Sequence, residues 1–362
     1  MTRGWLEAWW RHFGAGKRLL IAQHGRSFAP FHFQRHGPFR VGYILGTGPV
    51  ATRGMGLADR ADLFVGEPFP AELADALAAE AWDLLWLRAL PGEGGRREEG
   101  GGRREEAAAE SRFTTHVSRI EGFAEAARRQ GWGVDIRPRS VSPYLTLPAT
   151  WDDYLRSRTA SERYDYRNHR RQLEKAGELQ VELISGATDG AALLAELAEV
   201  EAASWKAAAG TALLLQPGLR PFFDEVVRDL LLAGQMAIAT LRLNGQMLAG
   251  MLCFSGSGVF STYNVAYRQG ARPFSPGTVL LLDSIERLIA QGYREVDFMR
   301  GEEEYKTRWA SGQRAEVDWI VTRPTARARL AAAVLVDGRE RLKNSPAVVR
   351  LRDAVLRRKR RR

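Results

Sequence analysis

The stretch from Val259 to Trp309 constrains the fold more than any other part of the sequence. It predicts a strand (VFSTYNVAY), a short loop, a helix that begins near Pro276, and a second strand (EVDFM) leading into a polar segment. A helix start leaves backbone N–H groups without partners and carries partial positive charge, so it can accept a phosphate without a basic side chain. The pattern therefore predicts an α/β unit whose central helix start is available to a phosphate-bearing ligand.

Length and composition indicate a folded protein of two domains. The chain has 362 residues, 45% of them hydrophobic, which is enough for two separate cores. Its single cysteine, Cys253, excludes an internal disulfide and lies in the apolar run MLCF, where a buried core residue is expected. No apolar run approaches the length of a membrane span, and the opening residues lack the layout of a signal peptide. We expect a cytoplasmic protein.

The net charge of +10 is concentrated at the end of the chain. Residues 323–362 contain 14 Lys and Arg against three acidic residues, so the preceding 322 residues are close to neutral. A near-neutral body argues against nucleic acid as a partner for that part of the protein. The basic tail suits an anionic membrane surface or a protein contact, and a solvated, partly disordered end is the alternative.

The chain divides into three parts by composition. Residues 1–148 predict a first α/β unit, interrupted at 93–110 by a low-complexity insertion of glycine and compensating charges that we expect to be disordered. Residues 149–325 predict a second unit, which starts with a helix-initiating Thr150. Residues 326–362 form the basic tail, helical or disordered.

The second unit has a distinctive order of expected elements. A helix that starts at Thr150 and a second helix at about 161–176 precede a strand (LQVELIS), helices at 191–208 and 219–233, and a three-stranded meander. The meander turns at Asn244-Gly245, the strongest short hairpin signal. The helix at 276–291 and its following strand, a short helix at 302–309 and a last strand (EVDWIV) complete the order β-α-α-β-β-β-α-β-α-β.

This order resembles the GNAT acyltransferase fold. The sequence is most similar to the BioF2-like or CelD-like acetyltransferase branch, relatives of the tandem-domain Fem aminoacyltransferases, through the segments WLEAWWRHFG, SPYLTLP, TWDDYL, RYDYRNHRRQLEKAG, FSPGTVLLLDSIE and DFMRGEEEYKTRW. The resemblance covers nearly the whole chain except the insertion and the tail. It implies tandem GNAT-like domains with mixed, mostly antiparallel sheets flanked by helices. The usual GNAT phosphate loop is absent, and the segment from Arg272 to Thr278 stands in its place.

That segment carries the expected site for the donor's diphosphate. Ser275 can cap the helix, and Pro276 suits its first position. Gly277 lacks a Cβ, so a phosphate could approach the N–H groups of Gly277, Thr278 and Val279. Arg272 could add a charge-assisted contact. An ordinary, well-formed helix start is the alternative.

The resemblance also implies where the chemistry occurs. In the GNAT fold the strands on either side of this helix diverge and a pantetheine arm lies between them, which would place the thioester near Tyr263, Asn264 and Val265. A backbone N–H of the first strand would polarise the carbonyl. Tyr305 and Lys306 could then reach the sulfur or the diphosphate.

The proton acceptor for the transfer is an acidic residue in this interpretation. Asp297 or Glu304 could serve as the base, directly or through water. The alternative for Asp297 is a structural hydrogen bond to the following turn.

A basic helix is the candidate for binding the acceptor. Arg163, Arg167 and Arg171 recur every four residues and share one face, with Arg170 adjacent. They could bind an anionic acceptor such as a sugar nucleotide, or they could simply form a solvated face. The histidines lack metal-ligand spacing, so no metal is expected.

Together these features predict an acyl-CoA-dependent N- or O-acyltransferase, with acetyl-CoA as the expected co-substrate. The resemblance implies a small-molecule or glycan acceptor: an amino sugar, a polysaccharide precursor or a cell-envelope component. Two alternatives stay open. One is a Fem-like transferase that uses aminoacyl-tRNA, and the other is a binding or scaffold protein that kept the GNAT fold without its chemistry.

Overall fold

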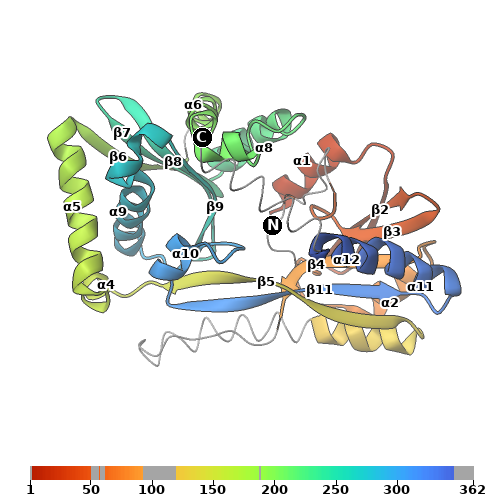
Figure 1. Ribbon diagram of the computed structural model, residues 1–362. Helices are drawn as coiled ribbons and strands as arrows, with labels where there is room; N and C mark the ends of the chain where they lie inside the picture. The colour runs from red at the N-terminus through yellow and green to blue at the C-terminus, as the bar shows by residue number, and fades with distance from the viewer. Residues whose placement is uncertain (1, 50–56, 58–61, 93–119, 187–188, 346–362) are drawn as a thin grey trace.

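A computed structural model describes residues 2–49, 57, 62–92, 120–186 and 189–345. Within these residues eleven strands form one sheet, in the order β1-β2-β3-β4-β11-β5-β10-β9-β8-β7-β6 (Figure 1). Two neighbouring pairs, β3–β4 and β9–β10, are parallel and the others are antiparallel. The expected α/β class with mixed, mostly antiparallel strands flanked by helices is therefore confirmed. The expected insertion at 93–110 lies outside the described residues.

The first half of the chain builds one end of the sheet. Its elements are α1 (Arg3–Phe13), β1 (Arg18–His24), β2 (Ser27–His36), β3 (Phe39–Ile44), α2 (Pro70–Ala78), β4 (Leu84–Pro91), a helix over 120–129, and β5 (Gly133–Thr146). Phe31, Phe33, Leu85 and Trp319 pack with α2 and the helix at 120–129 in one apolar cluster. No helix among the described residues is long and apolar enough to cross a membrane.

Two long strands join the halves of the molecule. β5 pairs with β10 (Glu295–Asp297) through its last residues and with β11 (Gly312–Thr322) along most of its length. β11 then pairs with β4, so the last strand of the second half lies against the first half. The division near residue 149 stays a prediction, and any separation there would break the β5–β11 ladder.

The second half carries helices on both faces of its strands. Its remaining elements are α4 (Trp151–Ser157), α5 (Ala160–Ala176), β6 (Leu179–Ile184), α6 (Gly190–Ala202), α7 (Trp205–Ala209), α8 (Arg220–Leu232), β7 (Met236–Leu243), β8 (Gln246–Gly256), β9 (Val259–Tyr267), a 3-10 segment η2 (Gln269–Phe274), α9 (Pro276–Ala290) and α10 (Glu304–Trp309). α5 and α9 cover one face, and α6 and α8 cover the other (Figure 1). α1 joins the α6–α8 layer through Trp5 and Trp9.

Local sequence signals explain most of these boundaries. Thr150 accepts from the N–H of Asp153 at the start of α4, and Thr159 forms a capping box with Glu162 at the start of α5. The hairpin between β7 and β8 turns at Asn244-Gly245, both at positive φ, as expected. The helix expected over 191–208 is instead broken: α6 ends at Ala202, and Ser204 caps the separate α7 by accepting from the N–H of Lys206.

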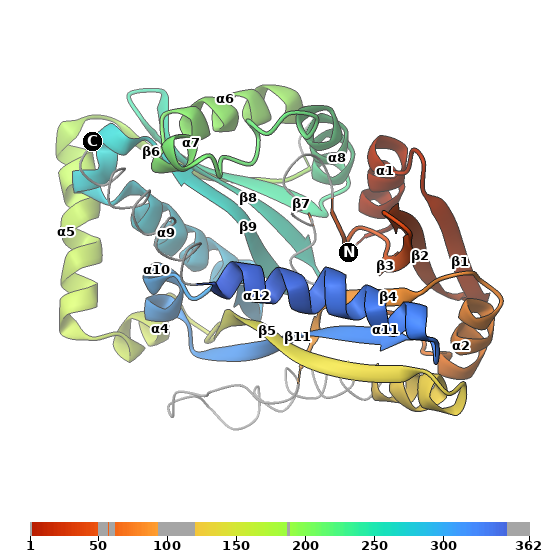
Figure 2. The ribbon, with the colours of Figure 1, turned by 45° about the vertical axis from the view of Figure 1, so that its right-hand side comes forward.

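The beginning of the basic tail is helical. α11 (Ala326–Ala332), a π-helical segment η3 (Ala333–Asp337) and α12 (Gly338–Asn344) continue one another alongside β11 (Figure 2). Val336 packs with Tyr43, Leu84 and Ile320 in an apolar cluster on that face of the sheet. Residues 346–362 lie outside the described part of the chain.

Candidate active site

The strands on either side of α9 separate after a short contact. β9 and β10 pair only at Val259–Ser261 with Glu295–Asp297. Beyond Ser261, β9 stays with β8 up to Tyr267, whereas the chain after β10 follows β5. The N–H of Phe298 donates to the carbonyl of Pro143 (3.0 Å), and the N–H of Gly301 donates to that of Val141 (3.0 Å). Beyond Ser261, β10 therefore no longer follows the edge of β9 that faces away from β8, which is the divergence that the resemblance implied.

A β-bulge changes the direction of β9 at this divergence. The register against β8 shifts between Leu252, opposite Asn264, and Cys253, opposite Thr262, so Tyr263 is the extra residue. Phe260 packs on the α9 side, whereas Tyr263 packs with Trp5 and Phe223 on the α8 side. A bulge re-aims side chains and interrupts the ladder, and both effects fall here beside the strand gap.

Asn264 belongs to a buried polar group beside the gap. Its Nδ2 donates to Glu201 Oε1 (2.9 Å), and its Oδ1 accepts from Lys206 Nζ (2.6 Å). Glu201 is fully buried and also accepts from the backbone N–H groups of Leu213 (3.1 Å) and Leu214 (2.7 Å). Its carboxylate is therefore saturated by hydrogen bonds and fixes the break between α6 and α7 that presents Lys206.

Lys306 lies close enough to this group to interact with it electrostatically. The residue is 7% exposed, and its Nζ donates to the carbonyl of Arg300 (2.6 Å) and pairs with Glu303 Oε2 (3.0 Å). Burial, the largest effect, lowers the pKa of Lys206, and the positive charge of Lys306 lowers it further. The negative charges of Glu201 and Glu303 act in the opposite direction. We name Lys206, Lys306, Glu201, Glu303 and Asn264 the lysine cluster. It holds two potential cations and two acids.

Two further predicted catalytic residues lie near the same gap. Tyr305 is 41% exposed, and burial by surrounding protein, together with Glu303, raises its pKa. Asp297 is 2% exposed, and its Oδ1 accepts from Ser142 Oγ (3.0 Å) and from the N–H of Met299 (2.9 Å). The bond to Met299 is the structural hydrogen bond to the following turn that was the alternative to a catalytic role for Asp297.

The start of α9 differs from its expected geometry. Ser275 has a left-handed backbone (φ 46°), and its side chain makes no capping hydrogen bond, so the expected side-chain cap is wrong. The N–H groups of Thr278 and Val279 both donate to the carbonyl of Ser275 (3.0 and 3.1 Å). In this conformation these two N–H groups are therefore not available to a phosphate, contrary to expectation. The left-handed turn at Ser275 places its carbonyl against them.

Two groups at the α9 start are still open. Among the described residues the N–H of Gly277 has no hydrogen-bond acceptor, and the side chain of Arg272 is exposed without a polar partner. A Cβ at position 277 would meet Tyr267 Cδ1 at 3.4 Å, an ordinary contact. Val265 and Tyr267 both pack toward α9, on the side opposite Asn264. The donor site expected from sequence is therefore reduced to Gly277 and Arg272 beside β9.

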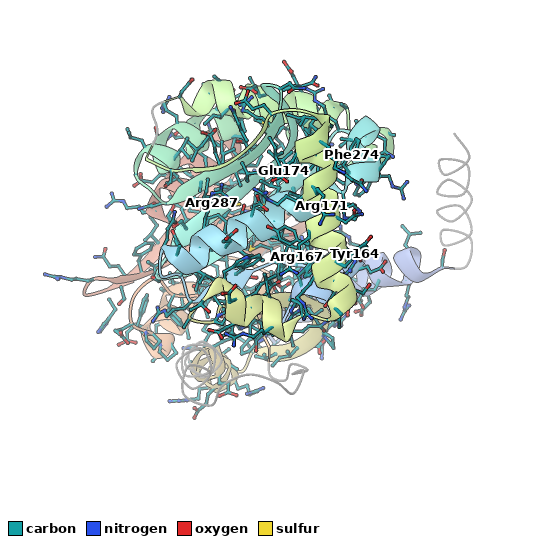
Figure 3. The ribbon with its side chains drawn as sticks, turned by 90° about the vertical axis from the view of Figure 1, so that its left-hand side faces the viewer. Tyr164, Arg167, Arg171, Glu174, Phe274 and Arg287 are labelled. Carbon is teal, nitrogen blue, oxygen red and sulfur yellow. The ribbon has the colours of Figure 1, made fainter. Side chains whose placement is uncertain are left out.

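The arginines of α5 do not act as one surface. Arg163 donates to the carbonyls of Leu155 and Arg158, and Arg170 pairs with Asp283 and Glu174. Both side chains therefore stabilise local structure. Arg167 and Arg171 are exposed along α5, and Figure 3 shows them near Tyr164, with Phe274 of η2 beside the same helix. Of the expected four, only these two are open to a ligand.

Among the described residues, potential metal ligands and the cysteine give no competing site. Within the described residues no cluster of His, Cys, Asp and Glu could hold a metal ion. Cys253 is fully buried, and burial raises the pKa of its thiol well above its usual value. The sequence interpretation did not find Glu201 and Lys206. The only local signal was the Ser204-Trp205-Lys206 run within an expected helix, and Asn264 lies 58 residues from Lys206 in the chain.

Comparison with protein families agrees with this geometry. Residues 160–307 match the family described as an acetyltransferase (GNAT) domain. In sequence this part of the chain is therefore similar to GNAT acetyltransferases. The matched range contains α5, the lysine cluster, α9 and Tyr305, and so the whole of the candidate site. No curated protein matches the chain.

Solved structures extend the likeness of fold to both halves. The crystal structure of FemX has a TM-score of 0.55 at 12% identity, over 92% of this chain and 93% of that chain. The C-terminal domain of a protein assigned as a lysylphosphatidylglycerol synthetase from Agrobacterium fabrum has a TM-score of 0.53 at 13% identity, over 91% of each chain. A conserved protein of unknown function from Bacteroides thetaiotaomicron reaches 0.52 at 10% identity, over 88% of this chain and 89% of that one. At such identities these likenesses concern the fold alone.

Proposed function

We propose that the protein is an acyl-CoA-dependent N- or O-acyltransferase, with acetyl-CoA as the donor. The observation that carries the proposal is the divergence of β9 from β10 beside the start of α9, combined with the bulge at Tyr263. A thioester lying in that gap would meet the backbone of β9 where β10 has diverged from it. Hydrogen-bond donors fixed in advance at a developing oxyanion are commonly the largest single contribution to acyl transfer.

Individual residues then take defined roles. The N–H of Gly277 and the guanidinium of Arg272 would hold the donor's diphosphate. Ser275 and Thr278 shape the turn, while Tyr263 and Val265 hold the strand in place on either side of Asn264. Asp297 would position the segment after β10 through its hydrogen bond to the N–H of Met299.

The acid and base are proposed from the pKa shifts together with the geometry. The acceptor's amine or hydroxyl attacks the thioester carbonyl, the C–S bond breaks, and the acceptor's proton passes to the neutral amine of Lys206. A lowered pKa makes that neutral form more accessible. Tyr305 is protonated at neutral pH, as its raised pKa also requires, and can donate that proton to the leaving thiolate. Lys306 would add positive charge near the sulfur.

For the acceptor we keep the class that the sequence resemblance suggested: an amino sugar, a polysaccharide precursor or a cell-envelope component. A Fem-like transferase is the second candidate, supported by the likeness to FemX over 92% of this chain. The two candidates differ in the donor, which is acyl-CoA in the first and aminoacyl-tRNA in the second.

Calorimetric titration of the full chain with acetyl-CoA tests the proposal. Wild type should bind, and Gly277→Ala should bind at least about ten-fold more weakly, because a methyl group would stand where the phosphate approaches the N–H. The position has room for a Cβ, so folding should be retained. Gly270→Ala is the matched control, since its Cβ would meet nothing within 4 Å. Absence of acetyl-CoA binding by the wild type at millimolar concentration would contradict the proposal.

A further inference from the structure

Three neighbouring strands are distorted around a single carboxylate, that of Asp318. The β11–β4 register shifts between Val317 and Trp319, so β4 has an extra residue opposite Asp318. The β11–β5 register shifts between Glu316 and Val317, which makes Arg139 the extra residue of β5. On β4, Ala89 has φ 59°, a conformation that costs a residue with a Cβ about 1–2 kcal/mol. Bulges of this kind often occur beside functional sites.

The carboxylate of Asp318 is surrounded by donors. Arg139 Nη1 lies 3.1 Å from both of its oxygens. Trp86 Nε1 donates to Oδ2 (3.1 Å), and the N–H of Ala89 donates to Oδ1 (3.1 Å). Arg88 Nε lies farther away, 3.8 Å from Oδ2. Arg139 and the backbone therefore satisfy Asp318 without Arg88.

Positive charge exceeds negative charge at this point. The guanidiniums of Arg88 and Arg339 both lie over the Trp86 ring, 5.2 and 5.8 Å from its centroid. Arg88 makes no hydrogen bond to any described residue, and its side chain, like that of Arg139, is only 13% exposed. Burial lowers the pKa of Arg88 to about 10, Arg139 and Arg339 lower it too, and Asp318 opposes them. We name Arg88, Arg139 and Arg339 the arginine cluster.

Other charged groups nearby are already engaged. Glu316 Oε2 accepts from Ser140 Oγ (2.9 Å), and Arg137 pairs with Asp135, Asp337 and Glu340. The Tyr43 hydroxyl lies 3.1 Å from His36 Nε2. A mostly buried guanidinium without a hydrogen bond is costly, so the arrangement favours a further anion.

The arginine cluster lies on the same face of the sheet as the candidate active site. Arg314, Glu316 and Asp318 alternate along β11 and so project to one face. Arg314 binds Glu295 of β10, and Ser142, directly opposite Arg314, binds Asp297. Ser142 and Arg139 are three residues apart on β5, a distance of about 10 Å along the strand. A polar row thus connects the two places.

We propose that the arginine cluster is the acceptor's anion-binding subsite, so that the acceptor carries a phosphate or diphosphate group. This inference rests on the proposed acyltransferase function for its biological meaning. Guanidiniums bind phosphate oxygens through paired N–H donors, and Arg88 has such donors unused. The anion would lie between α12, which carries Arg339, and the strands that carry Arg88 and Arg139 (Figure 2). The acceptor's reactive group would then extend toward Ser142 and Asp297.

Titration of the full chain with inorganic pyrophosphate tests the inference. We expect binding to wild type and a loss of affinity of about ten-fold or more in Arg88→Met. Because Arg88 lacks hydrogen bonds and is repelled by its neighbours, Arg88→Met should keep or raise the unfolding temperature. A purely structural Arg88 would lower it. Arg228→Met, in an exposed pair on α8, is the control and should bind as wild type does.

Two comparisons, one between variants and one between anions, test where the anion binds and whether it is a phosphate. Retained pyrophosphate binding in Gly277→Ala together with lost binding in Arg88→Met supports the inference. The reverse pattern, or lost binding only in Arg171→Met, would overturn it. Glucuronate, tested in parallel, should bind more weakly than pyrophosphate, and stronger glucuronate binding would overturn the phosphate class. Acetyl-CoA is titrated separately. The pyrophosphate result can therefore be interpreted even if acetyl-CoA does not bind.

Discussion

The molecule contains two largely buried polar groups beside its long sheet, and they differ in charge balance. In the lysine cluster two lysines lie with two acids, and every acid oxygen named above has a partner. In the arginine cluster Arg88 and Arg139 lie beside Asp318, and Arg339 adds a third positive charge over the Trp86 ring. A balanced group is suited to hold neutral reacting groups and move a proton, whereas an excess of positive charge is suited to bind an anion. The lysine cluster is thus suited to the chemical step, and the arginine cluster is suited to binding the acceptor.

The largest effect should come from breaking the balance in the lysine cluster. Glu201→Gln would leave Lys206 buried without its acid and weaken the hydrogen bonds to Leu213 and Leu214. We expect a loss of about 3–5 kcal/mol in the free energy of unfolding. Urea denaturation measures it, with Glu199→Gln, an exposed position on the same helix, as a control that should change by less than about 0.5 kcal/mol. A loss no greater than that of the control would show that the cluster is not structural.

Removal of the proposed acid should affect turnover and leave binding intact. Tyr305→Phe should lower kcat about 100-fold or more while acetyl-CoA affinity stays within about two-fold, since the hydroxyl acts on the leaving thiolate and not on the bound donor. Steady-state kinetics with calorimetry provide both values. Tyr164→Phe, on the exposed side of α5, should match wild type. Unchanged turnover in Tyr305→Phe would remove this residue from the mechanism.

The pH dependence of stability and of kcat tests the role of Lys206. Its folded-state pKa is lowered, so between that pKa and 10.5 the unfolded state binds more protons and stability increases with pH. kcat should also rise with pH as Lys206 loses its proton. Lys206→Met should abolish both dependences, whereas Lys175→Met on the exposed face of α5 should keep them. A pH–rate profile of Lys206→Met that still rises as in wild type would assign the base elsewhere.

The smallest expected effect concerns the strain beside Asp318. Ala89→Gly should relieve the left-handed backbone and raise the free energy of unfolding by about 1 kcal/mol. The same change should leave pyrophosphate affinity within about two-fold, because the N–H that binds Asp318 is retained. Thermal unfolding measures the first quantity. A destabilised Ala89→Gly protein would show that the turn at Ala89 is not strained.

Much of the fold was predictable because its signals are local. Thr150, Asn244-Gly245 and Pro276 mark boundaries that the structure confirms. Joining of the halves through β5 and β11 was not predicted, because strand pairing across about 180 residues leaves no trace in hydrophobic periodicity. The left-handed Ser275 was missed as well, since a serine before proline usually suggests a side-chain cap.

The site was only partly predictable for the same reason. Tyr305, Lys306 and the β9 segment follow from family resemblance in one contiguous stretch. Glu201 and Lys206 come from a broken helix and meet Asn264 only in three dimensions. The arginine periodicity of α5 was a correct observation, but Arg163 and Arg170 are bound to nearby backbone and acids. Helical spacing reports which residues share a face, not whether their charges are already satisfied.

Hydrogen exchange with and without acetyl-CoA would show whether the donor binds between β9 and β10. If the gap between β9 and β10 admits the thioester donor, acetyl-CoA should slow amide exchange in residues 262–267 and at Gly277, with little change in β1 and β2. Protection confined to other segments, or none at saturating acetyl-CoA, would contradict the account.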